Sequence, residues 1–185
     1  MNVYRFKSAL ILLSLLLELG GTATYARAST QESARSDLQR KIRKELVTLP
    51  YYGVFDNLAY KVDGNTVTLY GKVVRPTTRS DAERRVERLR GVSRVVNNIE
   101  VLPLSSFDDS LRRQTYRAIY RTAGLYRYLL GANPSIHIIV DRGHIELEGV
   151  VSNQGDAQLA YMAARGVSGA FSVTNNLRVE RRRAY

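Results

Sequence analysis

Three arginines recur at every fourth residue of one predicted helix, and two tyrosines lie next to them. Arg113, Arg117 and Arg121 share one helical face, and Tyr116 and Tyr120 lie beside it. A guanidinium group binds phosphate through a planar fork of donors, and tyrosine suits the boundary between the apolar and hydrated parts of a bilayer. The pattern favours contact with lipid phosphate. A solvated helix face and a face packed against the rest of the chain are the alternatives.

The other polar residues predict neither catalysis nor a metal site. His137 alternates with apolar strand residues, so we expect it on the solvent side of its strand, and His144 lies at a turn. Neither histidine has the spacing of a metal ligand. Asp63 and Asp141 occupy hairpin turns, where aspartate bonds to local backbone. The sequence has no cysteine, which excludes thiolate chemistry and disulfides. We predict a protein that is not an enzyme and needs no cofactor.

The helix that carries these arginines belongs to a chain built on an internal repeat. Residues 62–101 align without a gap on residues 140–179 after a shift of 78 residues, and eleven positions are then identical. Most of these are Val, Leu, Gly or Asn, which suit core and turn positions. A structural role is expected for four pairs, Gly71/Gly149, Gly91/Gly169, Asn97/Asn175 and Asn98/Asn176. The folded part of the chain is therefore two copies of one small module.

The first copy, residues 37–102, predicts the order helix, strand, strand, helix, strand. An apolar stripe predicts a first helix that ends at Pro50. Alternating apolar residues predict two strands joined by a tight turn at residues 63–65. The second helix is expected to be capped at residue 80 or 81 and to end at Gly91. A third strand completes the module.

The second copy, residues 110–180, follows a short linker, residues 103–109. Its first helix is the longest helical pattern in the chain, residues 111–130, and Tyr126 is among the residues expected to face inward. The remaining elements follow those of the first copy.

The N-terminus has the features of a secretory signal. A short basic region precedes an almost wholly apolar run, residues 8–17, and Ala26 and Ala28 supply the small residues that a signal peptidase reads. The run is too short for a relaxed membrane span. We predict a signal peptide, residues 1–28, cleaved after Ala28; an uncleaved anchor is the alternative. Residues 29–36 are expected to form a flexible lead-in and residues 181–185 a basic tail.

The repeated unit carries two linked motifs. One is a strand that contains glycine, residues 67–73 and 145–151, and the other is Gly-x-x-x-Val-x-Asn-Asn-x-x-Val, residues 91–101 and 169–179. They resemble the BON domain of OsmY-like exported bacterial proteins. The resemblance implies an α+β fold of two tandem αββαβ modules, each a small three-stranded mixed sheet with two helices packed on it. It also implies periplasmic localisation, binding of anionic phospholipid and support of envelope integrity or stress tolerance.

The net charge of +11 favours an acidic partner, although a solvated basic surface has the same composition. A second, less aromatic basic surface lies on the first helix at Arg40, Lys41, Arg43 and Lys44. Export would separate the protein from chromosomal nucleic acid, so we predict no nucleic-acid partner. The leading hypothesis is a peripheral periplasmic protein that binds anionic phospholipid at a membrane surface. The alternative is a protein-interaction module in an envelope or secretion assembly.

Overall fold

The computed structural model describes residues 32–131 and 133–180. The predicted signal peptide, its cleavage site at Ala28 and the basic tail lie outside the described residues. The chain divides into two units between residues 41 and 42. Residues 32–47 are helical. We expected a flexible lead-in at residues 29–36, but its described part is helical, because Glu, Ala and Arg favour helices and no Gly or Pro interrupts them.

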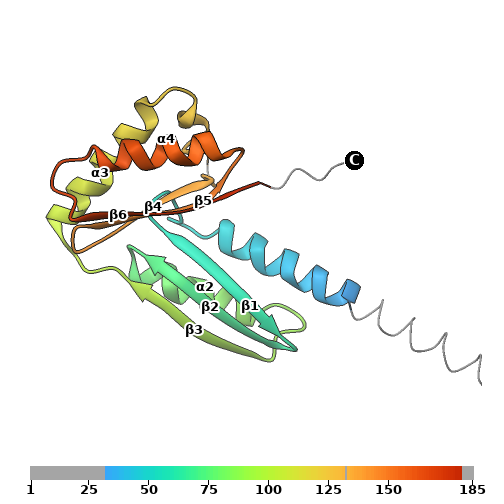
Figure 1. Ribbon diagram of the computed structural model, residues 1–185. Helices are drawn as coiled ribbons and strands as arrows, with labels where there is room; N and C mark the ends of the chain where they lie inside the picture. The colour runs from blue at the N-terminus through green and yellow to red at the C-terminus, as the bar shows by residue number, and fades with distance from the viewer. Residues whose placement is uncertain (1–31, 132, 181–185) are drawn as a thin grey trace, which may run out of the picture. The chain divides into compact units, whose positions relative to one another are not determined.

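The first module builds one small mixed sheet (Figure 1). Strands β1 (Asn57–Asp63) and β2 (Thr66–Val73) form an antiparallel hairpin, and β3 (Arg94–Val101) pairs in parallel with β2. Helix α2 (Pro76–Glu87) makes the crossover between β2 and β3. The buried apolar side chains of the sheet and this helix include Val62, Val67, Leu69, Val73, Ala82, Val86 and Ile99.

The second module repeats this sheet. Helix α3 (Ser106–Arg121) and the 3-10 helix η1 (Leu125–Tyr128) precede the antiparallel hairpin of β4 (Ile136–Asp141) and β5 (His144–Val151). Helix α4 (Gln154–Arg165) then crosses to β6 (Ser172–Val179), which is parallel to β5. The predicted α+β fold of two tandem modules, each with a three-stranded mixed sheet, is confirmed.

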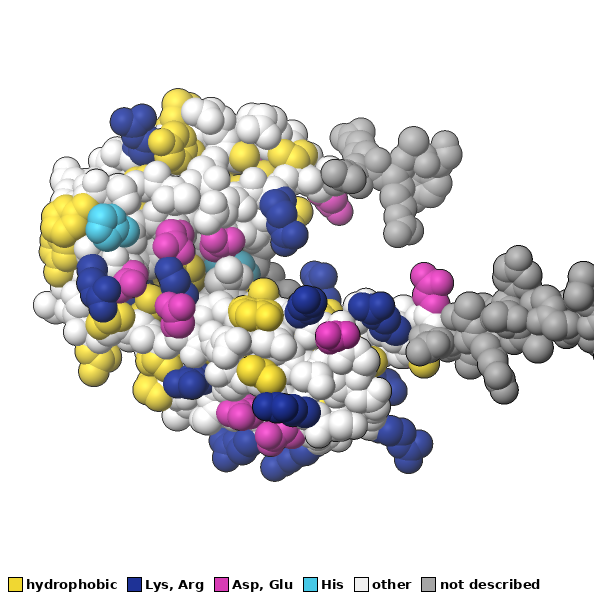
Figure 2. Space-filling view, turned by 60° about the horizontal axis from the view of Figure 1, so that its bottom comes forward, with side chains coloured by type: hydrophobic (Ala, Val, Ile, Leu, Met, Phe, Trp, Pro, Cys, Tyr) yellow, Lys and Arg dark blue, Asp and Glu magenta, His cyan; other side chains and the backbone are white. Residues whose placement is uncertain are grey.

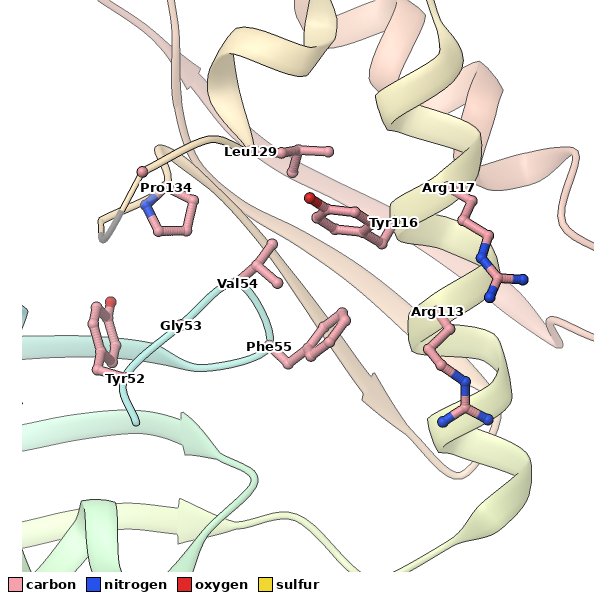
Figure 3. A pocket seen from close by; sticks show the side chains of 10 residues that line it. Tyr52, Gly53, Val54, Phe55, Arg113, Tyr116, Arg117, Leu129 and Pro134 are labelled. Carbon is pink, nitrogen blue, oxygen red and sulfur yellow. The ribbon is translucent and has the colours of Figure 1, made fainter. Parts of the chain in front are cut away.

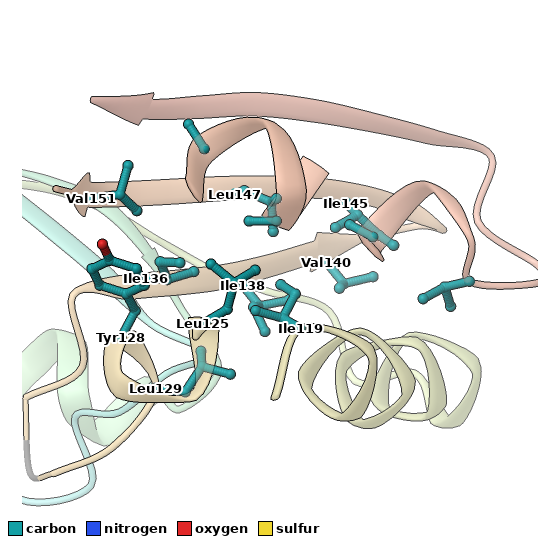
Figure 4. Close-up of a cluster of buried hydrophobic side chains, with 14 of the residues drawn as sticks. Ile119, Leu125, Tyr128, Leu129, Ile136, Ile138, Val140, Ile145, Leu147 and Val151 are labelled. Carbon is teal, nitrogen blue, oxygen red and sulfur yellow. The ribbon is translucent and has the colours of Figure 1, made fainter. Parts of the chain in front are cut away.

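Alternate residues of β4 and β5 point from the sheet toward the helices and make the core of the second module (Figure 4). Ile136, Ile138 and Ile145 are fully buried there. They meet apolar side chains from the preceding helices, Leu111, Ile119, Leu125 and Leu129. Burial of each such side chain contributes about 1.5–3 kcal/mol, so this face fixes the position of α3 on the sheet.

Helix α3 begins earlier and ends earlier than the predicted helix at residues 111–130. It begins after Ser105, whose hydroxyl accepts the backbone N–H of Asp108, and two aspartates in its first turn favour that end of the helix dipole. It ends at Arg121, because Thr122 is extended and Gly124 adopts a left-handed conformation with φ 79°. The break turns Tyr126 outward, where it is 50 % exposed, rather than into the core.

Helix α2 also begins before its predicted cap. Pro76 is its first residue, and no side chain caps it. Proline is suited to this position because its fixed φ is helical and its missing N–H would have no helical partner. The predicted caps at residues 80 and 81 therefore lie inside the helix. The helix ends at Glu87, and Gly91 lies in the following turn with φ 99°; Gly169 repeats this with φ 90°.

The repeated glycines of the second strands permit a close backbone approach. Gly71 and Gly149 have φ of 118° and 120°. A Cβ atom there would lie 2.0 Å from the carbonyl oxygen of Asn57 or Ser135, respectively. Only glycine fits such a conformation and contact.

The repeated asparagines tie the last strand of each module to its helix or to its neighbouring strand. Asn97 Nδ2 donates to the carbonyl of Arg79 at 3.2 Å, and Asn175 Nδ2 donates to the carbonyl of Ala157 at the same distance. The next asparagine points elsewhere: Asn176 Nδ2 donates to Glu148 at 2.6 Å, and Asn98 is exposed. The first asparagine of each pair therefore fixes the helix to the sheet.

Gly149→Ala is expected to destabilise the fold by at least about 2 kcal/mol, because it adds a backbone clash to a strained φ. Urea unfolding followed by circular dichroism measures this difference. Gly53→Ala is the matched control, because a Cβ atom at Gly53 meets nothing within 4 Å. Equal stability of the two variants would contradict the packing role of Gly149.

Candidate functional site

A short connecting segment, residues 52–56, joins the first helix to β1 and packs on the second module. The carbonyl of Val54 accepts the backbone N–H of Ile138 at 2.7 Å, so the segment lies along the free edge of β4. Val54 and Phe55 also pack against the second module's core. The segment therefore covers an edge strand that would otherwise expose unpaired backbone groups.

Asp56 fixes the shape of this segment. Its carboxylate is 4 % exposed and accepts the backbone N–H groups of Gly53 at 3.1 Å and Val74 at 2.8 Å. Burial raises the pKa of Asp56, and the two hydrogen bonds oppose that shift. The carboxylate thus holds the segment to the end of β2.

His137 lies under the connecting segment, and the prediction of a solvent-exposed histidine was wrong. It is 7 % exposed, its ring centroid lies 5.5 Å from that of Tyr52, and its Nδ1 lies 3.2 Å from the carbonyl oxygen of Gly53. The alternation of β4 identified the face correctly, but that face is covered by a segment distant in sequence. Burial lowers the pKa of His137, which favours the neutral ring.

The first turn of α3 is tied to the β4–β5 hairpin. The buried carboxylate of Asp108 accepts the backbone N–H groups of Arg142 at 2.9 Å and Gly143 at 2.8 Å. Arg112, also buried, donates to the carbonyl of Val140 at 2.6 Å. These contacts and the apolar core fix which face of α3 points away from the sheet.

That outward face carries the predicted arginine row. Arg113, Arg117 and Arg121 are all exposed. None has an ion-pair or hydrogen-bond partner within residues 32–131 and 133–180. Several other arginines are paired, such as Arg127 with Asp156 at 2.6 Å. The guanidinium groups of the row are therefore available to an external anion.

Aromatic rings form a continuous line beside the arginine row. Tyr116 and Tyr120 stack with centroids 5.9 Å apart. Phe55 meets Tyr116 edge-on at 6.4 Å, and Tyr120 meets Tyr126 edge-on at 6.4 Å. The helix contributes two of these rings, the connecting segment one, and η1 one. The structure thus brings Tyr116 and Tyr120 together with two rings that the sequence did not assign to the site.

A groove of about 480 Å³ lies between the connecting segment and α3 (Figure 3). Tyr116 points into it from the helix, and Val54 and Phe55 lie across from it. Leu129 and Pro134 line another part of the wall, and Arg113 and Arg117 line the helix side. Tyr120 and Arg121 do not line it. The predicted site therefore divides into a groove and a more exposed part along the same helix.

Sequence reasoning missed the groove because its walls come from distant parts of the chain. A signal was present: residues 51–55 are mostly aromatic or apolar, although they follow Pro50 and belong to no predicted helix or strand. Such a run outside a regular element indicates a packed connection. Its partner on α3 could not be identified without the fold.

Charge elsewhere is mixed. Figure 2 shows a face on which Lys and Arg side chains alternate with Asp and Glu side chains and form no single basic surface. Within the described part of the chain, no cluster of His, Asp and Glu could hold a metal ion. None of the described helices combines the length and apolar character that crossing a bilayer requires.

The fold and this surface define a class: a tandem α+β repeat protein whose candidate site is a binding surface on the first helix of its second module. The BON domain family model matches residues 34–103 and 111–181, and the chain belongs to this family. BON domains are known in envelope and periplasmic proteins, and membership points to a non-catalytic module. No curated protein sequence matches the chain.

Two solved structures of CdsD, a structural protein of the type III secretion system of Chlamydia trachomatis, match the chain. For the C-terminal domain, the identity is 11 %, the TM-score is 0.29, and the match covers 78 % of this chain and 98 % of that one. The second structure has the same identity and TM-score and is covered to 92 %.

His137 is expected to make stability depend on pH. Because its pKa in the folded state is below the unfolded value of 6.5, the unfolded state binds more protons as the pH falls below about 6.5. The contribution of His137 to the free energy of unfolding is therefore fully present above that pH. It decreases below that pH, by at most about 1.4 kcal/mol per pH unit for one proton. Urea unfolding between pH 7.5 and 5 measures this slope.

His137→Asn removes the titrating ring and keeps an N–H donor for the carbonyl of Gly53. The variant is expected to lack the slope contributed by the ring, whereas His144→Asn, at an exposed position, is expected to retain it. Comparison of the variants cancels contributions from other groups such as Asp56. The same slope in wild type and His137→Asn would contradict this role.

Proposed function

We propose that this BON-family protein binds anionic phospholipid at a membrane surface of the cell envelope and supports envelope integrity without catalysis. One observation carries the proposal: Arg113, Arg117 and Arg121 project from one helix face, with no partner among the described residues, next to stacked tyrosines. Arginine binds phosphate through paired donors, and tyrosine has an apolar ring and a polar tip that suit a membrane interface.

The energy of such contact suits reversible, peripheral binding. Each basic residue near an anionic surface contributes roughly 1 kcal/mol, so the row supplies about 3 kcal/mol. Tyr120 and Tyr126, 44 % and 50 % exposed, can add contact with the interface. The attraction is electrostatic and is therefore weakened by salt.

Membership of the BON family supports an envelope location, because such domains are known in envelope and periplasmic proteins. The predicted signal peptide, residues 1–28, supports export to the periplasm. Both fit a peripheral protein that meets phospholipid head groups from the periplasmic side.

The triple variant Arg113→Ala, Arg117→Ala, Arg121→Ala is expected to reduce binding to anionic vesicles by about 100-fold, because it removes about 3 kcal/mol of attraction. Flotation with phosphatidylglycerol–phosphatidylcholine vesicles of increasing anionic fraction, at low and high salt, measures the binding. A chain that begins at residue 29 keeps every described residue and lacks the apolar run at residues 8–17, which would itself enter a bilayer.

The matched control is Arg79→Ala, Arg88→Ala, Arg90→Ala, which removes the same charge from exposed positions of the first module. It is expected to bind as wild type does, apart from a small loss from net charge. Equal losses in the two triple variants would refute a site on α3. Absence of any preference for anionic over neutral vesicles would refute the lipid function itself.

A second candidate function, a protein-interaction module of an envelope assembly, is favoured by an exposed apolar cluster. Phe107 and Phe171 are 46 % and 71 % exposed, and Leu104, three residues before Phe107 in the sequence, is 97 % exposed. The rings of Phe107 and Phe171 lie 6.0 Å apart, and His144 lies 5.8 Å from Phe171. Clustered exposed apolar side chains are typical of protein contacts.

Phe171→Ser is expected to abolish co-purification of a stoichiometric envelope protein and to leave vesicle binding unchanged. Cross-linking in isolated envelopes followed by purification of this chain measures the first effect. A partner that is captured equally by the variant would contradict a contact through this cluster.

A further inference from the structure

The groove between the connecting segment and α3 has the chemistry of a site for one lipid chain. Its volume of about 480 Å³ lies in the range of small-molecule sites. Its walls are mostly apolar or aromatic, and its lining includes Arg113 and Arg117 but no Asp or Glu. A ligand that matches both the apolar walls and the two arginines must combine an apolar body with a negatively charged head.

The aromatic walls of the groove carry no negative charge over the physiological pH range. Burial raises the pKa of Tyr52 to about 12, so its phenol stays neutral beside the groove. Tyr116 is half-buried between Phe55 and Tyr120, whose ring contacts restrict its movement. The groove is thus preformed by rings from two separate segments rather than by mobile side chains.

The positive charge of the groove lies on its α3 side. Arg113 and Arg117 both come from α3, and neither has a partner among the described residues. The opposite wall, Val54 and Phe55, packs on the core of the second module. The guanidinium ends of Arg113 and Arg117 extend from α3 away from Val54 and Leu129 (Figure 3), so a head group would bind at the edge of the groove and its chain would cross Tyr116 to reach the apolar wall.

We propose that this groove binds a single acyl chain of an anionic phosphate-headed amphiphile, with the phosphate at Arg113 and Arg117 and the chain against Val54, Phe55 and Leu129. The inference rests on the proposed function in taking phospholipid as the natural ligand. It adds that one lipid chain leaves the plane of head groups and enters the protein. Binding therefore does not require a bilayer.

The test uses n-dodecyl phosphate below its micelle concentration and the chain that begins at residue 29. Isothermal titration measures affinity, and amide chemical shifts locate the ligand. Saturable binding is expected, with shifts at residues 53–55 and 129–131. Affinity should rise from butyl to octyl phosphate by up to about fourfold per buried methylene. Inorganic phosphate, which has no chain, and dodecyl maltoside, which has no charge, are expected to bind at least tenfold more weakly.

Arg113→Ala with Arg117→Ala should weaken dodecyl phosphate binding by at least tenfold. The control Arg79→Ala with Arg88→Ala, at exposed positions of the first module, should leave it within twofold of wild type. The proposal is overturned if dodecyl maltoside binds as tightly as the phosphate, if the two double variants behave alike, or if the shifts lie outside the groove. Preferential binding of an apolar peptide with no dependence on the arginines would also overturn it.

Vesicle flotation of the same proteins separates this proposal from the proposed function. Arg121 does not line the groove, so Arg121→Ala should weaken vesicle binding more than it weakens dodecyl phosphate binding. Vesicle binding without amphiphile binding would refute the groove and keep the membrane surface contact. Amphiphile binding without vesicle binding would keep the groove and refute the surface contact.

Discussion

The hydrogen bond from Ile138 to the carbonyl of Val54 is the contact on which the candidate site depends. It holds the connecting segment to the free edge of β4 and brings Phe55 against Tyr116. Three further contacts hold the segment: Asp56 binds its backbone from within, His137 packs beneath it, and its apolar side chains join the second module's core. Without them, α3 would present arginines and tyrosines on a bare helix, with no groove beside it.

The two copies differ in the connection between their first helix and first strand. In the first copy this connection is the short segment that crosses to β4. In the second, a break at Gly124 allows η1 to fold back and bury Leu125 and Leu129 in its own core. Leu129 also lines the groove. The divergent connections of the two copies therefore build the apolar walls that face α3 across the site, whereas the repeated strands only support it.

The contrast between repeated strands and divergent connections explains which parts of the structure could be predicted from the sequence. Strand alternation and the repeated glycines depend on local backbone geometry, so the tandem fold followed from the sequence. The ends of the helices were harder to predict, because each end is set by a single residue, such as the cap at Ser105 or the left-handed Gly124. Several nearby residues of similar type could have taken the same role. The burial of His137 depends on a contact with Gly53, 84 residues away, and the position of Phe55 depends on contact with Tyr116, a residue of a later helix. No local pattern encodes either contact. The arginine row was predictable as a helical face, but its aromatic neighbours across the groove were not.

The arginine row is also unfavourable for the isolated helix. Arg113 and Arg117, and Arg117 and Arg121, are like charges four residues apart, and each such pair destabilises a helix by about 0.2–0.5 kcal/mol. Elsewhere in the same module, arginine serves the fold: Arg112 binds the carbonyl of Val140, and Arg127 pairs with Asp156. Solubility does not require repulsion along one face, because scattered charges would serve equally well. A row that weakens its own helix, beside a neutral aromatic wall, is what the proposed anionic ligand requires, because such a ligand would offset the repulsion when it binds.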